Sequence, residues 1–348
     1  MSARSPTSFE VARRARVSRT TVSLVLNRVP GASISESTRA RVLKAARDMG
    51  YVPHAMGKAL ASRRTMSIGV AYSTEQTSHP FLQLVIEGLS RATRNRDQRL
   101  LVESFDERDR AAKVLQLTRA RQIDGLVMWG PRHGDPVIAA LARDGFPLVM
   151  IGSVEADGLC SIDIDNREAA RTIVAHLLDL GHRRIACITN APTSYLSSAD
   201  RLEGWREALH ARGVKPEAKL VRQGNFTAES GCEAMRSLLD GAVRQPTAVF
   251  AASDTVAFGA MKAIREGGLR VPDDVSVAGF DDIPLAAYAT PPLTTVGFPG
   301  IQEGIRAGEI LMDLLDGRIR PGYRETIETR LVIRQSTAKP ARTTMVHA

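Results

Sequence analysis

Short apolar runs alternate with longer segments of helical periodicity from Met66 onward. The apolar runs are Ser67–Tyr72, Leu100–Ser104, Leu126–Trp129, Leu148–Ile151, Ile185–Thr189, Ala248–Ala251 and Ser276–Ala278. The helical patterns between them include Phe81–Arg96, Arg167–Leu180, Leu202–Arg212, Ser230–Leu239 and Thr255–Gly267. This alternation is typical of parallel sheets flanked by helices. Because no period of about 20–50 residues repeats, the sequence excludes a solenoid.

A chain of 348 residues is longer than one hydrophobic core usually supports. We therefore expect two similar α/β lobes, one formed by residues 66–164 with 300–327 and the other by residues 165–296 with 328–336. A flexible tail, residues 337–348, would follow. This tail has almost no apolar residues, so it lacks the seam of a tetramerising coiled coil, and we expect a dimer.

Positive charge is concentrated in the first fifth of the chain. Residues 1–65 hold 13 Lys and Arg but 3 Asp and Glu, whereas the remainder holds 34 and 35. Such asymmetry is expected where one segment neutralises nucleic-acid phosphates and the rest does not. A basic tail without a specific role is the alternative, but this segment is patterned like a folded domain.

Three short helices are predicted in residues 1–52. Thr7 and Glu10 have the spacing of a capping box, which opens the first helix. A tight turn leads into a second helix, for which Ser18 is the N-cap. A third helix begins after Ser35 and ends at Gly50. Two helices joined by a tight turn and followed by a third form a helix-turn-helix module.

The second of these helices has two chemically distinct faces. Its apolar stripe consists of Val22, Val25 and Leu26. The opposite stripe carries hydrogen-bonding groups and one cation, namely Arg19, Thr20, Ser23 and Asn27. A helix with donors and acceptors at its N-terminal end fits a DNA major groove and can read base edges there. Many amphipathic surface helices share this pattern, so it does not establish DNA binding alone.

The sequence resembles the LacI/GalR family of bacterial transcriptional regulators. The similarity lies in residues 10–15 (EVARRA), 17–27 (VSRTTVSLVLN), 35–42 (SESTRARV) and 50–53 (GYVP), and it continues from residue 68 to about residue 335. The resemblance implies a helix-turn-helix headpiece (residues 1–52), a hinge helix (residues 53–65) and a two-lobed, periplasmic-binding-protein-like α/β core. It also implies a cytoplasmic repressor that binds double-stranded, pseudo-palindromic operator DNA as a homodimer. A small-molecule effector between the lobes would shift the core between closed and open states.

The resemblance assigns contacts with DNA to ten residues. Arg19 and Thr20 would read base edges, and Leu60 in the hinge would enter the minor groove as a wedge that kinks the duplex. Ser18, Thr21, Ser23 and Asn27 would mainly hold phosphates, and Thr7, His54 and Lys58 complete the set. For the hinge, a plain linker with Leu60 packed on its neighbouring domain is the alternative.

Five residues depart from the family pattern; two of them are His54 and Lys58, which replace the usual Asn and Arg of the hinge segment. Arg16 stands where glycine is usual, in a turn that tends to need a left-handed backbone, and a non-glycine residue there costs about 1–2 kcal/mol. Leu24 occupies a position that is often arginine, so no base preference is carried over. Gly57 lowers helix propensity by about 1 kcal/mol relative to alanine, which suits a hinge that folds only when bound.

Polar and aromatic side chains follow several of the predicted strands. In open α/β sheets, ligands bind beyond the carboxyl ends of strands. Carboxylates and a guanidinium can engage adjacent hydroxyls, and an aromatic face covers apolar C–H groups. We therefore predict a site for a sugar or related polyol that consists of Phe81, Trp129, Asp165, Arg201, Phe226, Asp254 and Asp281.

The support for these residues differs. Arg201, Phe226 and Asp281 match effector-contacting positions of the family. For the others, alternatives stay open: Asp254 as a cap of its helix, and Phe81 and Trp129 as ordinary core residues.

Other classes of protein find little support. The sequence has neither a glycine-rich phosphate loop after a strand nor a Gly-x-Ser-x-Gly motif, so we expect no enzyme. A sugar-modifying or sugar-binding α/β protein without a DNA role is the alternative. The seven histidines form no metal-ligand pattern, and the three dispersed cysteines are typical of reduced core thiols. We expect no cofactor, no metal, no membrane segment and no secretion signal.

Overall fold

The structure is a computed structural model that describes residues 6–27, 31–52, 64–77, 79–153, 157–240 and 245–341. The chain divides into two compact units, Met1–Met66 and Ser67–Ala348. Within the described ranges, no helix has the length and apolar character needed to cross a membrane.

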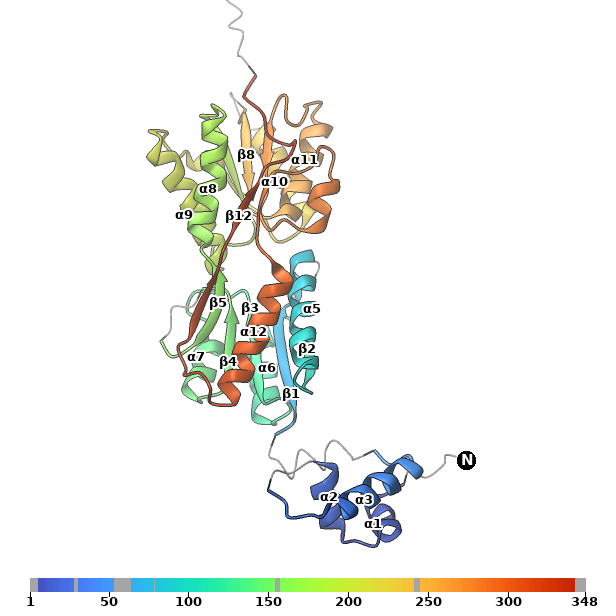
Figure 1. The fold of residues 1–348 in the computed structure, drawn as a ribbon. Coiled ribbons are helices and arrows are strands. Elements are labelled where there is room, and N and C mark those ends of the chain that lie inside the picture. The colour runs from blue at the N-terminus through green and yellow to red at the C-terminus, as the bar shows by residue number, and fades with distance from the viewer. Residues whose placement is uncertain are drawn as a thin grey trace, which may run out of the picture. The chain divides into compact units, whose positions relative to one another are not determined.

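The N-terminal unit consists of three helices around a small core. They are α1 (Ser8–Ala15), α2 (Arg19–Leu26) and α3 (Glu36–Asp48) (Figure 1). Each begins at its predicted N-cap, because Thr7, Ser18 and Ser35 each accept the backbone N–H three residues further on. The core is formed by Val11, Ala12, Ala15, Val22, Val25, Val42, Ala45 and Ala46. The described part of this unit is thus the predicted helix-turn-helix module.

Arg16 ends α1 with a left-handed backbone, at φ 53° and ψ 51°. The N–H of Val17 donates to the carbonyl of Ala12 at 3.0 Å, which holds the turn closed. We expect Arg16→Gly to raise the local unfolding free energy of the headpiece by about 1 kcal/mol. Glycine relieves about 1–2 kcal/mol of strain at this φ but gains freedom in the unfolded chain.

Hydrogen exchange of the α1–α3 amides in the full-length protein measures this gain. Arg16→Ala is the matched control, because it removes the same charge but keeps the Cβ. An equal gain in Arg16→Ala would attribute the effect to charge rather than to backbone strain.

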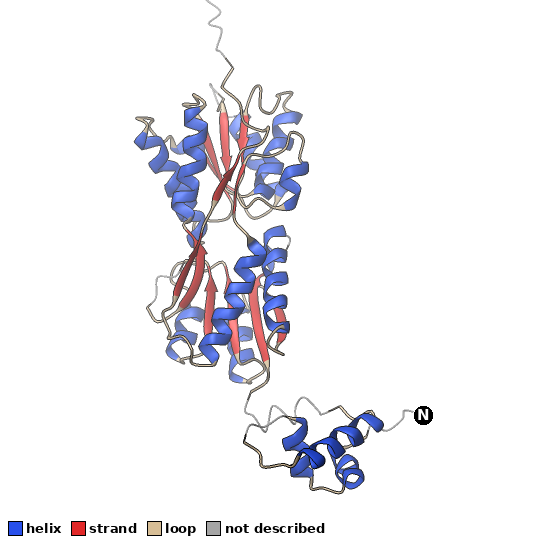
Figure 2. Ribbon diagram, in the orientation of Figure 1, coloured by secondary structure: helices blue, strands red, loops and turns tan. Residues whose placement is uncertain are grey.

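The N-terminal lobe of the second unit contains a six-stranded parallel sheet in the order β11-β5-β4-β3-β1-β2 (Figure 2). The strands are β1 (Ser67–Ser73), β2 (Arg99–Phe105), β3 (Gly125–Trp129), β4 (Leu148–Ile151), β5 (Cys160–Ile164) and β11 (Arg324–Ile327). The helices are α5 (Pro80–Arg94), α6 (Arg110–Arg119), α7 (Pro136–Arg143) and α12 (Gly300–Leu315). Apolar residues of α5 and α12 form the core against one face of the sheet, and those of α6 and α7 form the core against the other.

The C-terminal lobe repeats this plan with four parallel strands in the order β7-β6-β8-β9. The strands are β6 (Ile185–Thr189), β7 (Val221–Gln223), β8 (Ala248–Ala251) and β9 (Ser276–Ala278). The helices are α8 (Asn166–Asp179), α9 (Leu196–Ala211), α10 (Ala228–Asp240) and α11 (Asp254–Glu266). Helices α8 and α9 pack on one face of this sheet, and α10 and α11 pack on the other. The two-lobed α/β architecture predicted from the alternation is confirmed.

The chain passes between the two lobes three times (Figure 1). It does so between β5 and α8, between β10 (Thr295–Gly297) and α12, and between β11 and β12 (Arg330–Val332). Strands β10 and β12 pair antiparallel, so two of the passages are joined beside the C-terminal lobe. Three connections restrict the lobes to movements about this region.

The chain stays bonded to the C-terminal lobe after β12. The ring nitrogen Nε2 of His182 lies 2.9 Å from the carbonyl oxygen of Ala338, and the N–H of Ala338 donates to Ser276 at 3.0 Å. The predicted start of a flexible tail at residue 337 is therefore too early. A short polar segment without apolar periodicity gave no sign of these backbone hydrogen bonds.

Candidate functional site

Helix α2 presents a polar surface on the headpiece. Its Val22 and Val25 are buried, whereas Arg19 and Thr20 are exposed in the first turn. Within the part of the chain that the structure describes, neither Arg19 nor Thr20 makes a hydrogen bond or ion pair. Their side chains are available for base edges, as a recognition helix requires.

The other predicted phosphate contacts on α2 have partners inside the headpiece. The hydroxyls of Ser18 and Thr21 lie 2.9 Å apart, and the Asn27 amide donates to Ser23 Oγ at 3.1 Å. A hydroxyl that accepts one hydrogen bond can still donate another, so these groups can serve phosphates as well. These hydrogen bonds hold the side chains of Ser18, Thr21, Ser23 and Asn27 in place in the absence of DNA.

The remaining predicted DNA contacts divide into two groups. Thr7 is engaged in the capping box, where its hydroxyl donates to Glu10 Oε2 at 3.0 Å and accepts from the Glu10 N–H at 3.3 Å. His54, Lys58 and Leu60 lie outside the described residues, so their roles in the hinge stay predictions.

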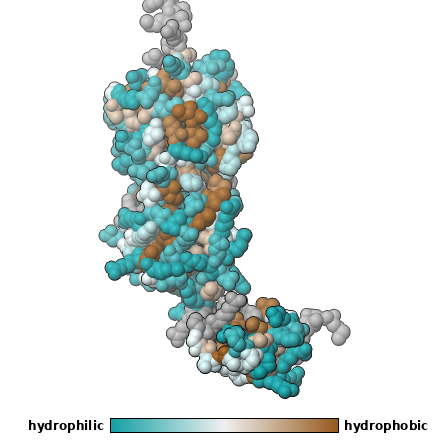
Figure 3. Space-filling model, in the orientation of Figure 1, coloured by the Kyte–Doolittle hydropathy of each residue, from teal (hydrophilic) through white to brown (hydrophobic). Residues whose placement is uncertain are grey.

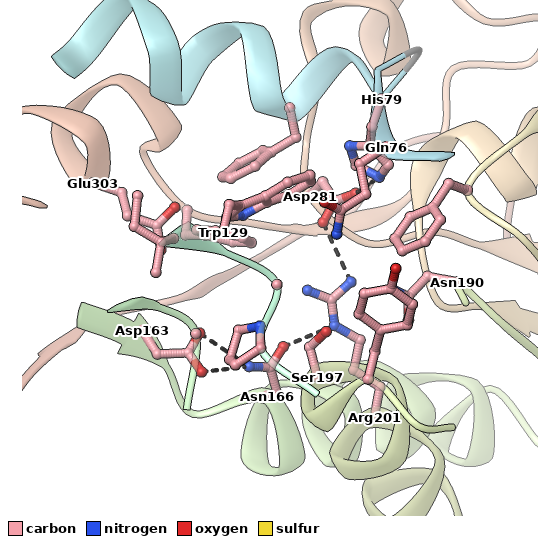
Figure 4. Close-up of a pocket in the computed structure, with 18 residues that line it drawn as sticks. Gln76, His79, Trp129, Asp163, Asn166, Asn190, Ser197, Arg201, Asp281 and Glu303 are labelled. Carbon is pink, nitrogen blue, oxygen red and sulfur yellow. Dashed lines mark hydrogen bonds and ion pairs between the residues drawn. The ribbon is translucent and has the colours of Figure 1, made fainter. Parts of the chain in front are cut away.

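A cavity lies between the two lobes of the core, at the carboxyl ends of strands from both sheets (Figure 4). The N-terminal lobe contributes residues that follow β1, β3 and β4, and residues at the end of β5. The C-terminal lobe contributes residues that follow β6, β7 and β9. Open α/β sheets place ligand sites at these ends of their strands.

Five of the seven predicted effector residues line this cavity: Phe81, Trp129, Arg201, Phe226 and Asp281. They come from both lobes, so the cavity requires the two lobes together.

Asp165 and Asp254 do not line the cavity, so the structure lends no support to their predicted role as effector contacts. Asp165 is exposed and caps α8 by accepting the N–H of Glu168 at 2.9 Å. Asp254 is fully buried, and its carboxylate accepts from Ile283 N–H at 2.9 Å and from Thr295 Oγ1 at 2.6 Å. The alternative of Asp254 as a helix cap is wrong as well, because Ser253 is the N-cap of α11.

Arg201 is the central cation of the cavity. It lies in α9, which begins at Leu196 rather than at the predicted Leu202. Its guanidinium donates to Asn166 Oδ1 at 2.8 Å and to the Ala252 carbonyl at 2.7 Å. A third, longer contact joins it to Asp281 Oδ1 at 3.4 Å. These contacts fix a buried positive charge in one orientation.

Asp281 combines a strained backbone with a buried carboxyl group. Its φ is 111°, a conformation that L-residues rarely adopt and that is often found at functional sites. The side chain is 3% exposed, and Oδ2 has no hydrogen-bond partner among the described residues. Burial raises the pKa of Asp281 to about 7, although Arg201 opposes the shift. The carboxyl group is therefore poised to accept a hydrogen bond from a ligand.

His79 faces Asp281 from the N-terminal lobe. Its Nε2 lies 3.6 Å from Asp281 Oδ2, and its Nδ1 has no partner among the described residues. Burial, with a smaller contribution from Arg201, lowers the pKa of His79 to about 3. The imidazole is neutral at pH 7, so the contact with Asp281 is not an ion pair.

Aromatic rings form the apolar part of the site. The ring centroids of Tyr195 and Phe226 are 5.1 Å apart, and those of His79 and Trp129 are 5.5 Å apart. Phe226 also has a left-handed backbone, with φ 60°, and its N–H donates to the Asn190 carbonyl at 2.7 Å. Rigid aromatic faces beside hydrogen-bonding groups suit the C–H and O–H surfaces of a sugar.

Two carboxyl groups on the N-terminal-lobe side complete the cavity. Asp163 accepts from Ser153 Oγ at 2.7 Å, and also from the Ile164 N–H and the Asn166 amide. Glu303 is 2% exposed in the first turn of α12, and its Oε2 has no partner among the described residues. Burial first, and then Asp163, raises the pKa of Glu303 well above its usual value.

Several cavity residues were not among the predicted site residues. They include Gln76, His79, Asp163, Asn166, Asn190, Tyr195 and Glu303. A signal existed for Asp163, since it stands two residues before Asp165 at the end of an apolar segment. The sequence also held a sign that Glu303 is buried: it stands between glycines at residues 300 and 304 in an otherwise apolar helix pattern.

Two segments, one from each lobe, contact each other beside the cavity. Arg132 and Tyr195 form an antiparallel bridge, and the Arg132 guanidinium lies 4.3 Å from the centroid of the Tyr195 ring and donates to its hydroxyl. Two backbone hydrogen bonds flank this pair, from His133 N–H to Ser194 O at 3.0 Å and from Leu196 N–H to the Pro131 carbonyl at 3.2 Å. We call residues 131–133 and 194–196 the mouth clasp.

Comparison with known proteins relates both units to regulators. Residues 9–54 match the model of bacterial regulatory proteins of the lacI family, and residues 174–337 match a periplasmic binding protein-like domain. The HTH-type transcriptional regulator CelR of Thermobifida fusca is 35% identical over 342 residues, which covers 96% of this chain and 98% of CelR. The HTH-type transcriptional repressor CytR of Escherichia coli K12 is 34% identical over 95% of this chain and 96% of CytR.

Solved structures show the same relationship. A complex of the transcriptional regulator CelR with cellobiose has a TM-score of 0.74, at 34% identity over 95% of this chain and 99% of that one. A lac repressor dimer bound to operator and the anti-inducer ONPF has a TM-score of 0.84, at 29% identity over 96% of this chain and all of that one. The chain therefore belongs to the LacI family of bacterial transcriptional regulators, with a DNA-binding headpiece and a periplasmic-binding-protein-like effector core.

Proposed function

We propose that this protein is a homodimeric repressor whose affinity for a pseudo-palindromic operator changes when a sugar or related polyol binds between the core lobes. Helix α2 of each protomer reads one half-site, with Arg19 and Thr20 on base edges and Ser18, Thr21, Ser23 and Asn27 on phosphates. The related lac repressor was solved as a dimer on its operator, and the related CelR with cellobiose.

One observation carries the ligand part of this proposal. Four buried polar atoms that line the cavity have no hydrogen-bond partner among the described residues: His79 Nδ1, Asn190 Oδ1, Asp281 Oδ2 and Glu303 Oε2. A buried polar group without a partner costs about 1–3 kcal/mol, so a ligand that satisfies several of them is favoured. Three of the four are acceptors, and a polyol brings the hydroxyl donors they need.

Ligand entry requires the lobes or their side chains to move. The cavity has a volume of about 50 Å³. At roughly 10–15 Å³ per water molecule, this space holds a few waters but no sugar ring. The mouth clasp is one of the contacts between the lobes that such a movement would break, as is the contact of His79 with Asp281. Because a ligand then favours one arrangement of the lobes, binding is coupled to the position of the segment that leads to the headpiece.

The surface of the core supports assembly. Figure 3 shows that the visible face of both lobes is largely hydrophilic, with separate hydrophobic patches on each lobe. Leu285 and Tyr288 in the C-terminal lobe are 59% and 83% exposed, which is unusual for large apolar side chains. Exposed apolar groups of this kind are often covered by a second subunit.

Asp281→Asn tests the ligand site. The variant keeps the shape but loses a charged acceptor, so we expect the affinity for a bound sugar to fall about tenfold to a hundredfold, equivalent to roughly 1.5–3 kcal/mol. Operator affinity without the sugar should stay close to that of the parent protein. Calorimetric titration of candidate sugars measures the change, and thermal unfolding of the same samples reports on stability.

The neighbouring residue provides the control. Asp282 does not line the cavity and pairs with Arg334 at 2.7 Å, so Asp282→Asn should lower stability and leave sugar affinity unchanged. If Asp281→Asn behaves like Asp282→Asn, Asp281 is a residue of the turn and the site assignment fails.

A further inference from the structure

We infer that the ligand of the cavity is an amino sugar whose ammonium group binds Glu303. The inference rests on the proposed function and adds the charge class of the ligand. It also implies that sugars carrying a phosphate or a carboxylate are excluded from the site.

Glu303 is a buried carboxyl group that points into the cavity without a partner. Figure 4 shows it on the side of the cavity where Trp129 lies, away from Arg201. Helix α12 packs closely on α5 beside it, because a Cβ at Gly304 would lie 2.1 Å from the carbonyl oxygen of Val85. A buried carboxylate that keeps an unused oxygen is costly unless a donor or a cation reaches it.

Acidic groups outnumber basic groups in the lining of the cavity. Asp163, Asp281 and Glu303 contribute three carboxyl groups, whereas Arg201 contributes one guanidinium and His79 is neutral. Arg201 already faces Asp281. An anionic ligand would add to the carboxyl excess, whereas an ammonium group would offset it.

The partners of the three carboxyl groups single out Glu303. Both oxygens of Asp163 accept hydrogen bonds from Ser153, Ile164 and Asn166. Asp281 has the guanidinium of Arg201. An ammonium brings three donors and a positive charge, which is the chemistry that Glu303 Oε2 lacks.

The surroundings of Glu303 also suit a cation on a sugar ring. In the same turn of α12, a Cβ at Gly300 would lie 2.8 Å from the Phe81 ring, so an aromatic ring packs directly on this turn. Phe81 also lines the cavity, and an aromatic ring whose face is turned to an ammonium group stabilises it. The unused oxygens of Asp281 and Asn190 then remain for the hydroxyls of the same ligand.

Calorimetry of the full-length protein at pH 7 tests the inference with matched probes. They are glucosamine, galactosamine and mannosamine, their neutral parent hexoses, and glucose 6-phosphate. We expect at least one amino sugar to bind more than about tenfold tighter than its parent hexose, and the phosphate not to bind. The ammonium group should lower the raised pKa of Glu303, so the protein should release protons when the amino sugar binds. The buffer takes up these protons, so the measured heat of binding should depend on the ionisation enthalpy of the buffer.

Glu303→Gln removes the charge and keeps the shape. We expect this variant to lose the preference for the amino sugar while its affinity for the parent hexose changes by less than about threefold. Glu309→Gln is the control on the same helix, because Glu309 pairs with Arg306 at the surface and does not line the cavity. The proton release is measured on the parent protein, so the inference stays testable even if Glu303→Gln fails to fold.

The outcomes separate this inference from the proposed function. Four outcomes would each overturn the amino-sugar assignment and leave sugar regulation intact. The parent hexoses could bind as tightly as the amino sugars, or Glu303→Gln could retain the preference for the amino sugar. Binding could also occur without proton release, or glucose 6-phosphate could bind tightly. If no sugar binds to a protein that still binds its operator, both the inference and the proposed effector class fail.

Discussion

Replacing Arg201 by methionine is expected to abolish sugar binding and to destabilise the C-terminal lobe by about 3–5 kcal/mol, because removal of one member of a buried ion pair leaves the other without compensation. The guanidinium is 7% exposed and is shared by Asn166, Ala252 and Asp281. Methionine fills similar space but leaves all three acceptors without their donor. Sugar affinity should fall more than about a hundredfold, since the same guanidinium orients Asp281 toward the cavity.

The destabilisation should depend on pH in a defined direction. Asp281 has a pKa of about 7 in the folded protein, well above its value of 3.8 when exposed. Below pH 7 the carboxyl group of Asp281 is protonated in the parent protein and in Arg201→Met, so replacement of the arginine removes little ion pairing. Above pH 7 the parent holds an ionised, paired Asp281, whereas the variant has no cation beside it. The difference in unfolding free energy should therefore be larger at pH 8 than at pH 6.

Arg206→Met is the matched control, on the same helix α9. Arg206 pairs with Glu203 at 3.1 Å, and both side chains are largely exposed. Exposed pairs of this kind contribute less than about 1 kcal/mol, so we expect nearly unchanged stability and sugar affinity. Denaturant unfolding and calorimetry measure both variants. If Arg201→Met loses no more than Arg206→Met, the central role of Arg201 is contradicted.

The lobes were predictable from the sequence because each depends on local patterns. Apolar runs of three to six residues marked seven of the core strands, and capping residues marked all three headpiece helices. The left-handed backbone of Arg16 was predictable because members of the family usually have glycine at this position. Although β9, also three residues long, was predicted, the three-residue strands β7, β10 and β12 were not. They are held by pairing with strands distant in sequence.

The composition of the site was predictable only in part. The prediction named Asp165 and not Asp163 because β5 was not among the predicted strands. Asp163 lies within β5, whereas Asp165 lies beyond its end and caps α8, and without the strand the sequence could not separate these two positions. Helix α9 starts earlier than its apolar pattern, since its first turn carries serines. Its start at Leu196 places Ser197 and Arg201 on the cavity.

Glu303 illustrates what a single sequence withholds. It reaches the cavity because α12 returns to the N-terminal lobe after the C-terminal lobe has been completed. The contact that seats it, between Gly304 and Val85, joins residues more than two hundred positions apart. Local periodicity carries no information on such a pairing, so periodicity alone could not assign Glu303 to the site.

Operator affinity is expected to fall about 10³–10⁵-fold between 50 and 200 mM salt, as for a protein that neutralises roughly 6–10 phosphates. The physical reason is counterion release by the headpiece, where residues 1–65 hold 13 of the 47 basic residues but 3 of the 38 acidic ones. The core cannot supply this effect, because its charges nearly cancel. Fluorescence anisotropy with an operator selected by the protein from random duplexes, titrated at several salt concentrations, measures the slope.

Two variants separate the electrostatic contribution from base reading. Thr20→Ala removes an exposed, neutral side chain at the start of α2, so the slope should stay unchanged while discrimination against other sequences falls by about 1–3 kcal/mol per half-site. Lys262→Gln removes an exposed cation that pairs with Glu266 on α11 of the core, and it should alter neither quantity. A slope near zero for the parent, or a slope that Lys262→Gln lowers, would place DNA binding outside the headpiece. Either result would contradict the assignment of α2 as the recognition helix.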